Sequence, residues 1–331
     1  MKFSLIVPVY NRPNEVEELL ESLTKQTRKD FEVVIVEDGS DLKSDTIVDN
    51  YKGELDIRYF FKPNSGPGQS RNYGYERAEG NYCIFLDSDC ILPPHYFETV
   101  QTELVNNYVD AFGGPDRAHT SFSKLQKAIN YSMTSFFTTG GIRGGKKKLD
   151  KFFPRSFNMG YSREVFDKTQ GFSKLRFGED IDMSIRIIEN GFHTKLIPEA
   201  YVYHKRRTNL RQFFKQVFNS GIARINLYKR HPQSLKLVHF APALFTIGTI
   251  LLVILAFIVS PYFLIPNLVH IILLFFDSMI KNKNASIAFL SIVTSYVQLF
   301  GYGFGFLKAF WKRIIFGGKD EFTAFRESFY E

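Results

Sequence analysis

The sequence predicts a doubly wound, mostly parallel α/β sheet domain followed by a C-terminal α-helical membrane region. Within residues 1–236, short apolar runs alternate with helical patterns and end on acidic residues or glycine. Residues 237–307, in contrast, carry very few charges. Because 331 residues exceed what one core usually holds, we expect two distinct parts.

The first elements form a βαβ pattern. Residues 3–10, "FSLIVPVY", are a continuous apolar run typical of a strand covered on both faces. Apolar residues then recur at helical spacing behind Asn14, a suitable N-cap, and a second Val/Ile strand at 31–40 ends in acid and glycine. Strand, helix and strand at this spacing predict a right-handed crossover.

The alternation then continues toward residue 89. We expect a helix near 44–52, a strand at 56–61, a glycine-rich turn and helix over 62–80, and a strand at 82–89. In such a sheet, ligands bind beyond the carboxyl ends of the strands. Asp38, Asp87 and Asp89 all lie at such ends.

Residues 110–205 are less regular but contain one clear helix. Its apolar face runs from Ile181 to Ile188, and Asn190 and Gly191 end it. Its first turn holds Glu179, Asp180 and Asp182, which either serve chemistry or complement the helix dipole.

Asp87 and Asp89 end the strand "FLDSD" only two residues apart. Two such carboxylates raise each other's pKa unless a cation compensates them. Mg²⁺ or Mn²⁺ commonly binds through one or two carboxylates plus substrate phosphates, although a solvated acidic loop is the alternative.

Five short motifs occur in a fixed order, and as a set they resemble the family 2 glycosyltransferases. They are "VPVYNR" at 7–12, "VEDGS" at 36–40, "GPGQSRNYG" at 66–74, "FLDSD" at 85–89 and "GED" at 178–180. The resemblance covers about residues 3–205 and implies an inverting enzyme with the GT-A fold. The C-terminal part is similar to membrane-anchored bacterial members that act on lipid-linked or envelope saccharides.

The resemblance implies a role for each motif in binding the donor nucleotide. The implied nucleotide-binding residues are Pro8, Val9, Tyr10, Asn11, Asp38, Arg71 and Asp87. The implied metal ligands are Asp89 and Asp87. The structural alternatives are that Asp38 only forms part of a turn and that Arg71 is a surface cation.

The family's catalytic carboxylate matches Asp180, with Glu179 as the competing candidate. Asn158, Met159 and Gly160 occupy the segment that lines the donor-sugar and acceptor pocket in relatives. His204 is either a third metal or phosphate ligand or a packed strand-end residue. The Gln-x-x-Arg-Trp motif of processive synthases is absent, so transfer of a single sugar is expected.

The function that the resemblance implies is metal-dependent, inverting transfer of a sugar from a nucleotide-sugar donor, with a UDP-sugar favoured and Mn²⁺ or Mg²⁺ as cofactor. The expected acceptor is a lipid-linked or cell-envelope saccharide, and a polyprenyl phosphate is the alternative. Two other classes of protein are the alternatives. A sugar nucleotidyltransferase would be expected to have a glycine-rich loop after its first strand, which "VPVYNRP" lacks. A non-enzymatic membrane scaffold predicts that the carboxylates are dispensable. No motif supports a nucleic-acid partner, and the oligomeric state is left open.

The predicted domains are a sheet domain at 1–207, an amphipathic interfacial region at 208–236, two to three membrane helices at 237–310 and a basic, polar tail at 311–331. An ordinary core-facing helix is the alternative for 208–230. For the third apolar segment, 285–310, the sequence is compatible with a spanning, a re-entrant or an interfacial helix.

No signal peptide pattern precedes the first strand, so the sheet domain is expected at the cytoplasmic face of the cytoplasmic membrane. Cys83 and Cys90 are expected to pack rather than pair, as in a reducing compartment. The net charge of +8 is concentrated in patches at 146–148, 205–207 and 229–230, which favour anionic lipid headgroups and phosphorylated substrates.

Overall fold

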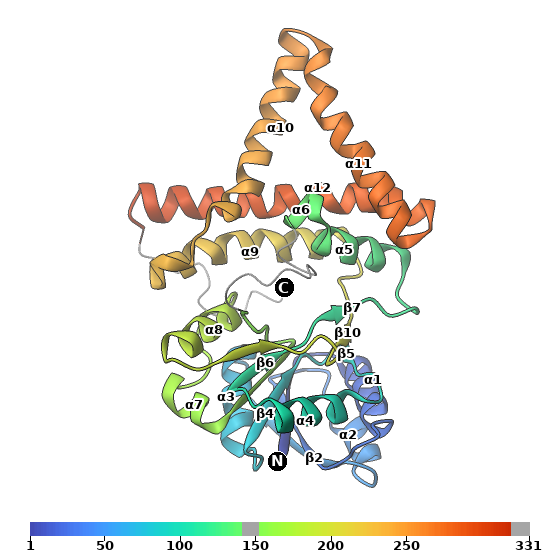
Figure 1. Cartoon of the computed structure of the whole chain (residues 1–331), viewed down its shortest axis with the longest axis vertical. Coiled ribbons are helices and arrows are strands. Elements are labelled where there is room, and N and C mark those ends of the chain that lie inside the picture. Colours follow the sequence, from blue (N-terminus) through green and yellow to red (C-terminus); the bar gives the residue numbers. More distant parts are fainter. Residues whose placement is uncertain (141–151, 319–331) are drawn as a thin grey trace. The chain divides into compact units, whose positions relative to one another are not determined.

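The computed structural model describes residues 1–140 and 152–318, so the predicted basic patch at 146–148 and most of the predicted tail lie outside the described residues (Figure 1). The described chain divides into two compact units. The first contains residues 1–117 and 152–204, and the second contains 118–140 and 205–318. The sequence predicts a sheet domain over 1–207, whereas the structure groups residues 118–140 of that range with the apolar C-terminal helices.

The first unit is built on a seven-stranded sheet. Its strands, in spatial order, are β3 (Asp56–Lys62), β2 (Phe31–Asp38), β1 (Phe3–Val9), β4 (Tyr82–Leu86), β8 (Asn158–Ser162), β6 (Ala111–Gly113) and β9 (Thr194–Leu196). The first four are mutually parallel, and β8 is antiparallel to both of its neighbours. The predicted mostly parallel sheet is confirmed.

Helices cover both faces of this sheet. They are α1 (Pro13–Thr24), α2 (Asp45–Tyr51), α3 (Pro67–Arg77), α4 (Tyr96–Asn106), α7 (Arg163–Thr169) and α8 (Glu179–Glu189). Alternate residues of β1 enter different apolar clusters: Leu5 packs in the cluster that contains Leu19 of α1, and Ile6 in the cluster that contains Met183 of α8. A strand buried on both faces explains the continuous apolar run in the sequence.

A second, three-stranded sheet brings distant parts of the chain together. It consists of β5 (Cys90–Ile91), β10 (Val202–His204) and β7 (Asp116–Arg117). Since β10 is antiparallel to β5, His204 lies opposite Cys90 and beside the end of the "FLDSD" motif. Both cysteines are free and buried, as predicted.

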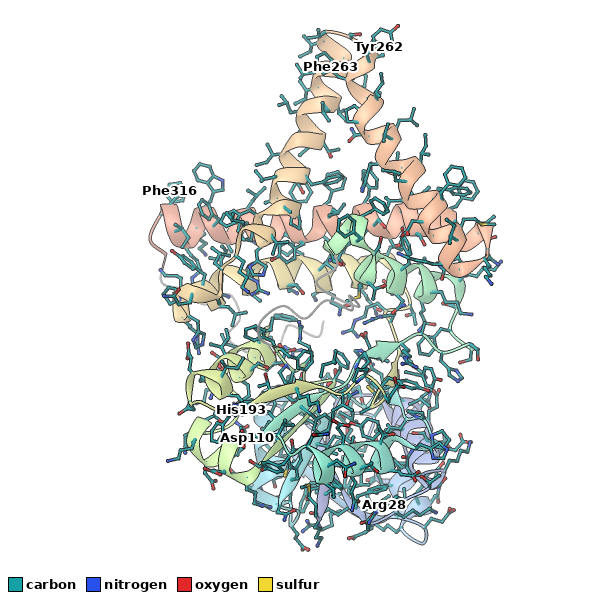
Figure 2. The ribbon with its side chains drawn as sticks, in the orientation of Figure 1. Arg28, Asp110, His193, Tyr262, Phe263 and Phe316 are labelled. Atoms are coloured by element: carbon teal, nitrogen blue, oxygen red, sulfur yellow. The ribbon has the colours of Figure 1, made fainter. Side chains whose placement is uncertain are left out.

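The second unit is helical. It contains α5 (Lys124–Thr134), α6 (Phe136–Thr139), α9 (Leu210–Arg230), α10 (Ala241–Ile258), α11 (Ile265–Asn282) and α12 (Ala285–Phe310). Short 3₁₀ segments cover Pro232–Ser234, Leu237–Phe240 and Pro261–Leu264, and a π-helical turn covers Trp311–Ile315. Tyr262 and Phe263 lie at the turn between α10 and α11 (Figure 2).

Three helical segments among the described residues are long and apolar enough to cross a membrane: Leu237–Ile258, Pro261–Asn282 and Ala285–Ile315. The first two are largely exposed, whereas much of the third is buried within the protein. This difference distinguishes α12 from the α10–α11 hairpin.

Candidate active site

The carboxyl ends of β2 and β3 are joined by a network around two buried acids of β2. Asp38 accepts hydrogen bonds from the backbone N–H groups of Ser65 and Gly66, each at 2.9 Å, and forms an ion pair with Lys62. Glu37 accepts from the N–H of Ser44 at 3.0 Å. Asp38, predicted to contact the nucleotide, therefore also fixes the loop that leads into α3.

The loop after β1 is fixed in the same way. The backbone N–H of Asn11 donates to Ser40 Oγ at 2.8 Å, and Asn11 Oδ1 accepts from the N–H of Leu42 at 2.9 Å. Pro8 and Tyr10 are half-buried and Val9 is buried in the core. These predicted nucleotide-binding residues thus stand on a rigid edge of the sheet.

Arg71 of α3 bridges two of the predicted site acids. Its Nη2 donates to Asp87 Oδ1 at 2.6 Å and its Nη1 donates to Glu179 Oε1 at 3.0 Å. The guanidinium is buried, and the ring of Phe172 lies 5.3 Å from its carbon. The alternative that Arg71 is a surface cation is therefore excluded. Its two ion pairs link the end of β4 to the start of α8.

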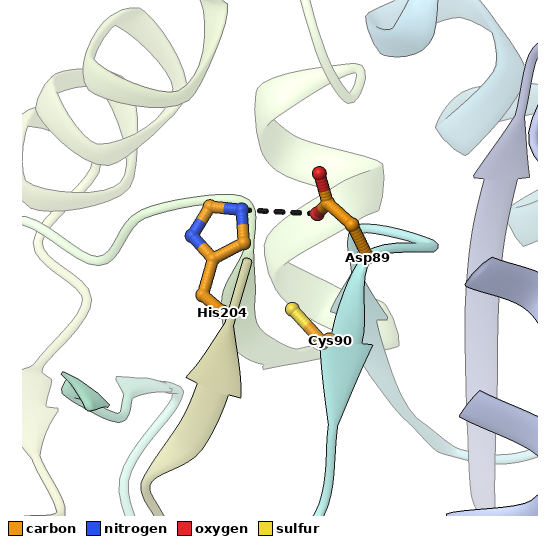
Figure 3. Close-up of side chains that lie close together, drawn as sticks. All are labelled: Asp89, Cys90 and His204. Carbon is orange, nitrogen blue, oxygen red and sulfur yellow. Dashed lines mark ion pairs between the residues drawn. The ribbon is translucent and has the colours of Figure 1, made fainter. Parts of the chain in front are cut away.

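Asp89 lies between an arginine and a histidine. Arg12 Nη1 donates to Asp89 Oδ2 at 2.7 Å, and His204 Nε2 lies 3.0 Å from Asp89 Oδ1 (Figure 3). The same His204 nitrogen is 3.9 Å from Asp87 Oδ2, and the ring stacks on Phe157 with centroids 5.0 Å apart. His204 is thus both packed and directed at the two carboxylates.

The first turn of α8 holds the two candidates for the catalytic base. Gly178 precedes them at φ +83°, a left-handed conformation that favours glycine and lets the helix begin at Glu179. Asp180 Oδ2 accepts from Arg155 Nε at 2.5 Å, and Asp180 Oδ1 accepts from the N–H of Ile181 at 2.8 Å. Both acids are buried.

The environments of the two acids push their pKa values apart. Burial, and then the charge of Asp180, raise the pKa of Glu179 despite the neighbouring Arg71. Burial opposes ionisation of Asp180 as well, but Arg155 outweighs it and holds the pKa of Asp180 below its usual range. Asp180 is therefore the carboxylate that stays charged.

The segment predicted to line the sugar pocket pairs with the "FLDSD" strand, since Asn158 lies opposite Leu86 and Met159 opposite Phe85. Asn158 accepts from Tyr96 Oη at 2.6 Å and donates to the carbonyl of Ala200 at 2.8 Å. Met159 lies in the core, and Gly160 lies against the ring of Phe112. In this structure the three residues hold the sheet together, and their contact with a sugar stays a prediction.

Sequence reasoning missed three cations of this site: Arg12, Lys62 and Arg155. Each pairs with a predicted site acid, namely Asp89, Asp38 and Asp180 respectively. Arg12 belongs to the quoted motif "VPVYNR", so its position was visible. Arg155 lies in an irregular segment 25 residues before its partner and had no local signal.

The residues at the end of β4 fit a divalent cation. His204 Nε2 lies 3.0 Å from a carboxylate oxygen of Asp89 and 3.9 Å from one of Asp87, so an imidazole stands next to both carboxylates. Oxygen ligands suit Mg²⁺ and Mn²⁺, and imidazole is an accepted nitrogen ligand of transition metals. The sulfur of Cys90 is also close to Asp89 and His204, but the pKa of its thiol is raised well above the usual range by burial, so thiolate ligation is disfavoured.

Comparison with known proteins identifies the class of the chain. The model of "Glycosyl transferase family 2" matches residues 4–170. The chain therefore belongs to glycosyl transferase family 2, as the ordered motifs predicted.

Individual relatives agree with this family. An uncharacterized glycosyltransferase of Rickettsia typhi is 39% identical over 220 residues, which cover 62% of this chain and 65% of the relative. The poly(ribitol-phosphate) beta-N-acetylglucosaminyltransferase TarS of Staphylococcus aureus is 44% identical over 93 residues, 27% of this chain and 16% of TarS. The chain spans less than two thirds of the length of each of these curated relatives.

A solved structure shows the same fold. The mannosyltransferase PcManGT from Pyrobaculum calidifontis, determined in complex with GDP-Man and Mn²⁺, matches 93% of this chain and 87% of that chain. The TM-score is 0.60 at 15% sequence identity, which supports the predicted GT-A fold.

Proposed function

We propose that the chain transfers a single sugar from a nucleotide-sugar donor to an acceptor hydroxyl, with inversion at the anomeric carbon and with Mn²⁺ or Mg²⁺ as cofactor. The observation that carries this proposal is the convergence of Asp87, Asp89 and His204 at the end of β4, joined through Arg71 to the first turn of α8. The metal site is thus linked by ion pairs to Glu179, the neighbour of the candidate base Asp180.

The roles follow from the chemistry of these side chains. Asp87, Asp89 and His204 would hold the metal ion, which when bound neutralises negative charge on the nucleoside diphosphate. Asp180 takes the proton from the acceptor hydroxyl while that oxygen bonds to the anomeric carbon and the bond to the diphosphate breaks. One direct displacement inverts the configuration.

We assign the base to Asp180 because it matches the family's catalytic carboxylate, and its electrostatic environment keeps it unprotonated. A base must be unprotonated at the working pH, and Arg155 keeps the pKa of Asp180 low. Glu179, with its raised pKa and its contact to Arg71, is better placed to orient that guanidinium. Neighbouring carboxylates with separated pKa values commonly divide the work in this manner.

The names of the relatives support a nucleotide-sugar donor. TarS is named a beta-N-acetylglucosaminyltransferase, and PcManGT was determined with GDP-Man and Mn²⁺. A UDP-sugar remains the preferred donor for this chain. The apolar helices support membrane association, and we propose that the acceptor is a lipid-linked or envelope saccharide at the cytoplasmic membrane face.

The first experiment is a thermal-shift panel of UDP-, GDP- and TDP-sugars, each with Mn²⁺, with Mg²⁺ and with a chelator. The true donor should raise the Tm, because a ligand present at 100 times its Kd stabilises the folded state by about 2.7 kcal/mol. The stabilisation should be lost in chelator. No shift with any donor in either metal would contradict the proposal.

Two variants separate metal binding from catalysis. Asp89→Ala should lose the metal-dependent shift, whereas Asp180→Asn should keep the shift and lose transfer. Asp30→Ala is a matched control, because Asp30 pairs with Arg28 at 2.6 Å on the surface of the first unit (Figure 2). Near-normal turnover of Asp180→Asn would show that the base is a different residue.

The acceptor is identified from the product. With a saccharide acceptor the newly formed bond is a glycoside, which is stable in mild acid, whereas with a polyprenyl-phosphate acceptor the newly formed bond is an acid-labile glycosyl phosphate. The product formed with each acceptor is therefore treated with mild acid and its charge is measured.

A further inference from the structure

The helices α9 and α12 of the second unit lie side by side and nearly touch at their backbones (Figure 1). A Cβ atom added to Gly305 of α12 would lie 1.9 Å from the carbonyl oxygen of Phe218 in α9. A Cβ added to Gly221 of α9 would lie 2.2 Å from the carbonyl oxygen of Tyr302 in α12. The "GYGFGF" sequence therefore serves close helix packing.

The other half of α12 packs against α5. Thr294 Oγ1 donates to the carbonyl oxygen of Ala128 at 3.0 Å, and both residues are buried. As a result, 44% of the apolar window that includes α12 is buried inside the protein, against 11% for each helix of the α10–α11 hairpin. Protein therefore covers a larger share of α12 than of α10 or α11.

α9 cannot accompany α12 across a bilayer. It carries five Lys or Arg residues and no Asp or Glu: Arg211, Lys215, Arg224, Lys229 and Arg230. The longest uncharged stretch, between Lys215 and Arg224, spans about 14 Å at 1.5 Å per residue. Since the hydrocarbon core is about 30 Å thick, any crossing would place several of these charges inside it.

We propose that α5, α9 and α12 form a platform that lies in the headgroup layer, parallel to the membrane surface, and that α10 and α11 are the only described helices that enter the hydrocarbon core. α12 is then an interfacial helix, although its length and composition would allow it to cross. This inference does not depend on the sugar-transfer reaction.

The charge distribution identifies the partner of the platform as an anionic lipid surface. Residues 205–318 contain 14 Lys or Arg residues and one acid, Asp277. None of these cations lies between Leu237 and Ile280, so all of them flank the hairpin. Basic residues beside a membrane insertion attract anionic headgroups.

Aromatic side chains occupy the positions expected at that depth. Phe289, Phe304 and Trp311 of the α12 segment are exposed, as is Phe316 just beyond it (Figure 2). Trp and other aromatic rings are enriched where hydrocarbon meets headgroups.

The proposal fixes the side of the membrane on which each end of α12 lies. A hairpin enters and leaves on one side, and a flat helix does not cross. Residues 283 and 316 should therefore lie on the same side as the first unit, whereas a spanning α12 places them on opposite sides.

Cysteine labelling of the full chain in intact spheroplasts tests this sidedness. Lys283→Cys, Phe316→Cys and the surface marker Asp30→Cys are each treated with a membrane-impermeant maleimide before and after lysis. The wild type is the blank, because Cys83 and Cys90 are buried. All three variants should label on the same side. Labelling of positions 283 and 316 from opposite sides would overturn the proposal.

Tryptophan depth provides a second test that does not need reactive thiols. Trp311 is the only tryptophan, so its quenching by shallow and deep spin-labelled lipids can be compared with that of Phe304→Trp in a Trp311→Phe background. Both should be quenched best by the shallow label. Leu251→Trp on α10, in the same background, is the deep control. Quenching of Phe304→Trp as deep as that of Leu251→Trp would refute the interfacial position.

Discussion

At the scale of single residues, the site is a set of acids that each meet a cation. Asp38 meets Lys62, Asp87 and Glu179 share Arg71, Asp89 meets Arg12, and Asp180 meets Arg155. Buried charges require such partners, and a buried pair loses much stability when one member is removed. Each of these acids therefore has a compensating cation beside it, and Arg155 holds the pKa of Asp180 below its usual range.

Replacing Arg155 should move the pH dependence of transfer. Arg155 favours the charged form of Asp180, so Arg155→Met should raise the pKa of that carboxyl, and the proposed base should then be protonated at higher pH. The acidic limb of the kcat–pH profile should therefore shift to higher pH, while KM for the donor changes little.

Two variants control this measurement. Arg155→Lys retains a positive charge and should restore part of the shift, whereas Arg28→Met removes an exposed arginine whose partner is Asp30. An unchanged acidic limb in Arg155→Met, with a folded protein shown by circular dichroism, would mean that Arg155 does not set the protonation of the base.

At the scale of elements, the function depends on where strands and helices end. β1, β2 and β4 end at one edge of the sheet, and α8 begins there after Gly178. β10 adds His204 from a separate small sheet. In the second unit, glycines allow α9 and α12 to approach closely, so packing replaces contact with lipid over much of α12.

Substitution of Gly305 tests this close packing. Gly305→Ala should lower the stability of the full chain in detergent by about 1–3 kcal/mol, as overpacking of a core does. Gly248→Ala is the matched control, because Gly248 lies in α10 with open space around its Cβ position. The Tm should fall for the first variant and stay equal or rise for the second. Equal Tm values for both would contradict close packing at Gly305.

At the scale of the whole molecule, the second unit combines an uncharged hairpin with a basic platform. The two parts bind a bilayer by different forces, since hydrocarbon insertion is insensitive to salt whereas headgroup attraction is screened. Without the hairpin, only the salt-sensitive attraction to headgroups should hold the protein at the membrane.

A chain that ends at residue 236 lacks both the hairpin and α12 but keeps α5 and α9 with their basic residues, so it should remain partly membrane-associated. High salt should release it, because the Debye length falls to about 3 Å at 1 M. The full chain should stay in the membrane under the same wash. Flotation of vesicles containing anionic or only neutral lipids measures the difference. A truncated chain that stays fully soluble at low salt would contradict this prediction.

The sequence by itself determined the family, the mostly parallel sheet and the apolar C-terminal helices. These features reside in local patterns: buried strands are continuous apolar runs, and the motifs keep a fixed order. It also indicated that Asp87 and Asp89 need a compensating cation.

Only the tertiary structure decided that Arg12 pairs with Asp89 and that Arg155 pairs with Asp180, because these partners are 77 and 25 residues apart in the chain and leave no periodic signal. It also decided what covers α12. The composition of a helix gives its hydrophobicity, but protein and lipid can both cover an apolar face, and only the packed neighbours α5 and α9 distinguish them.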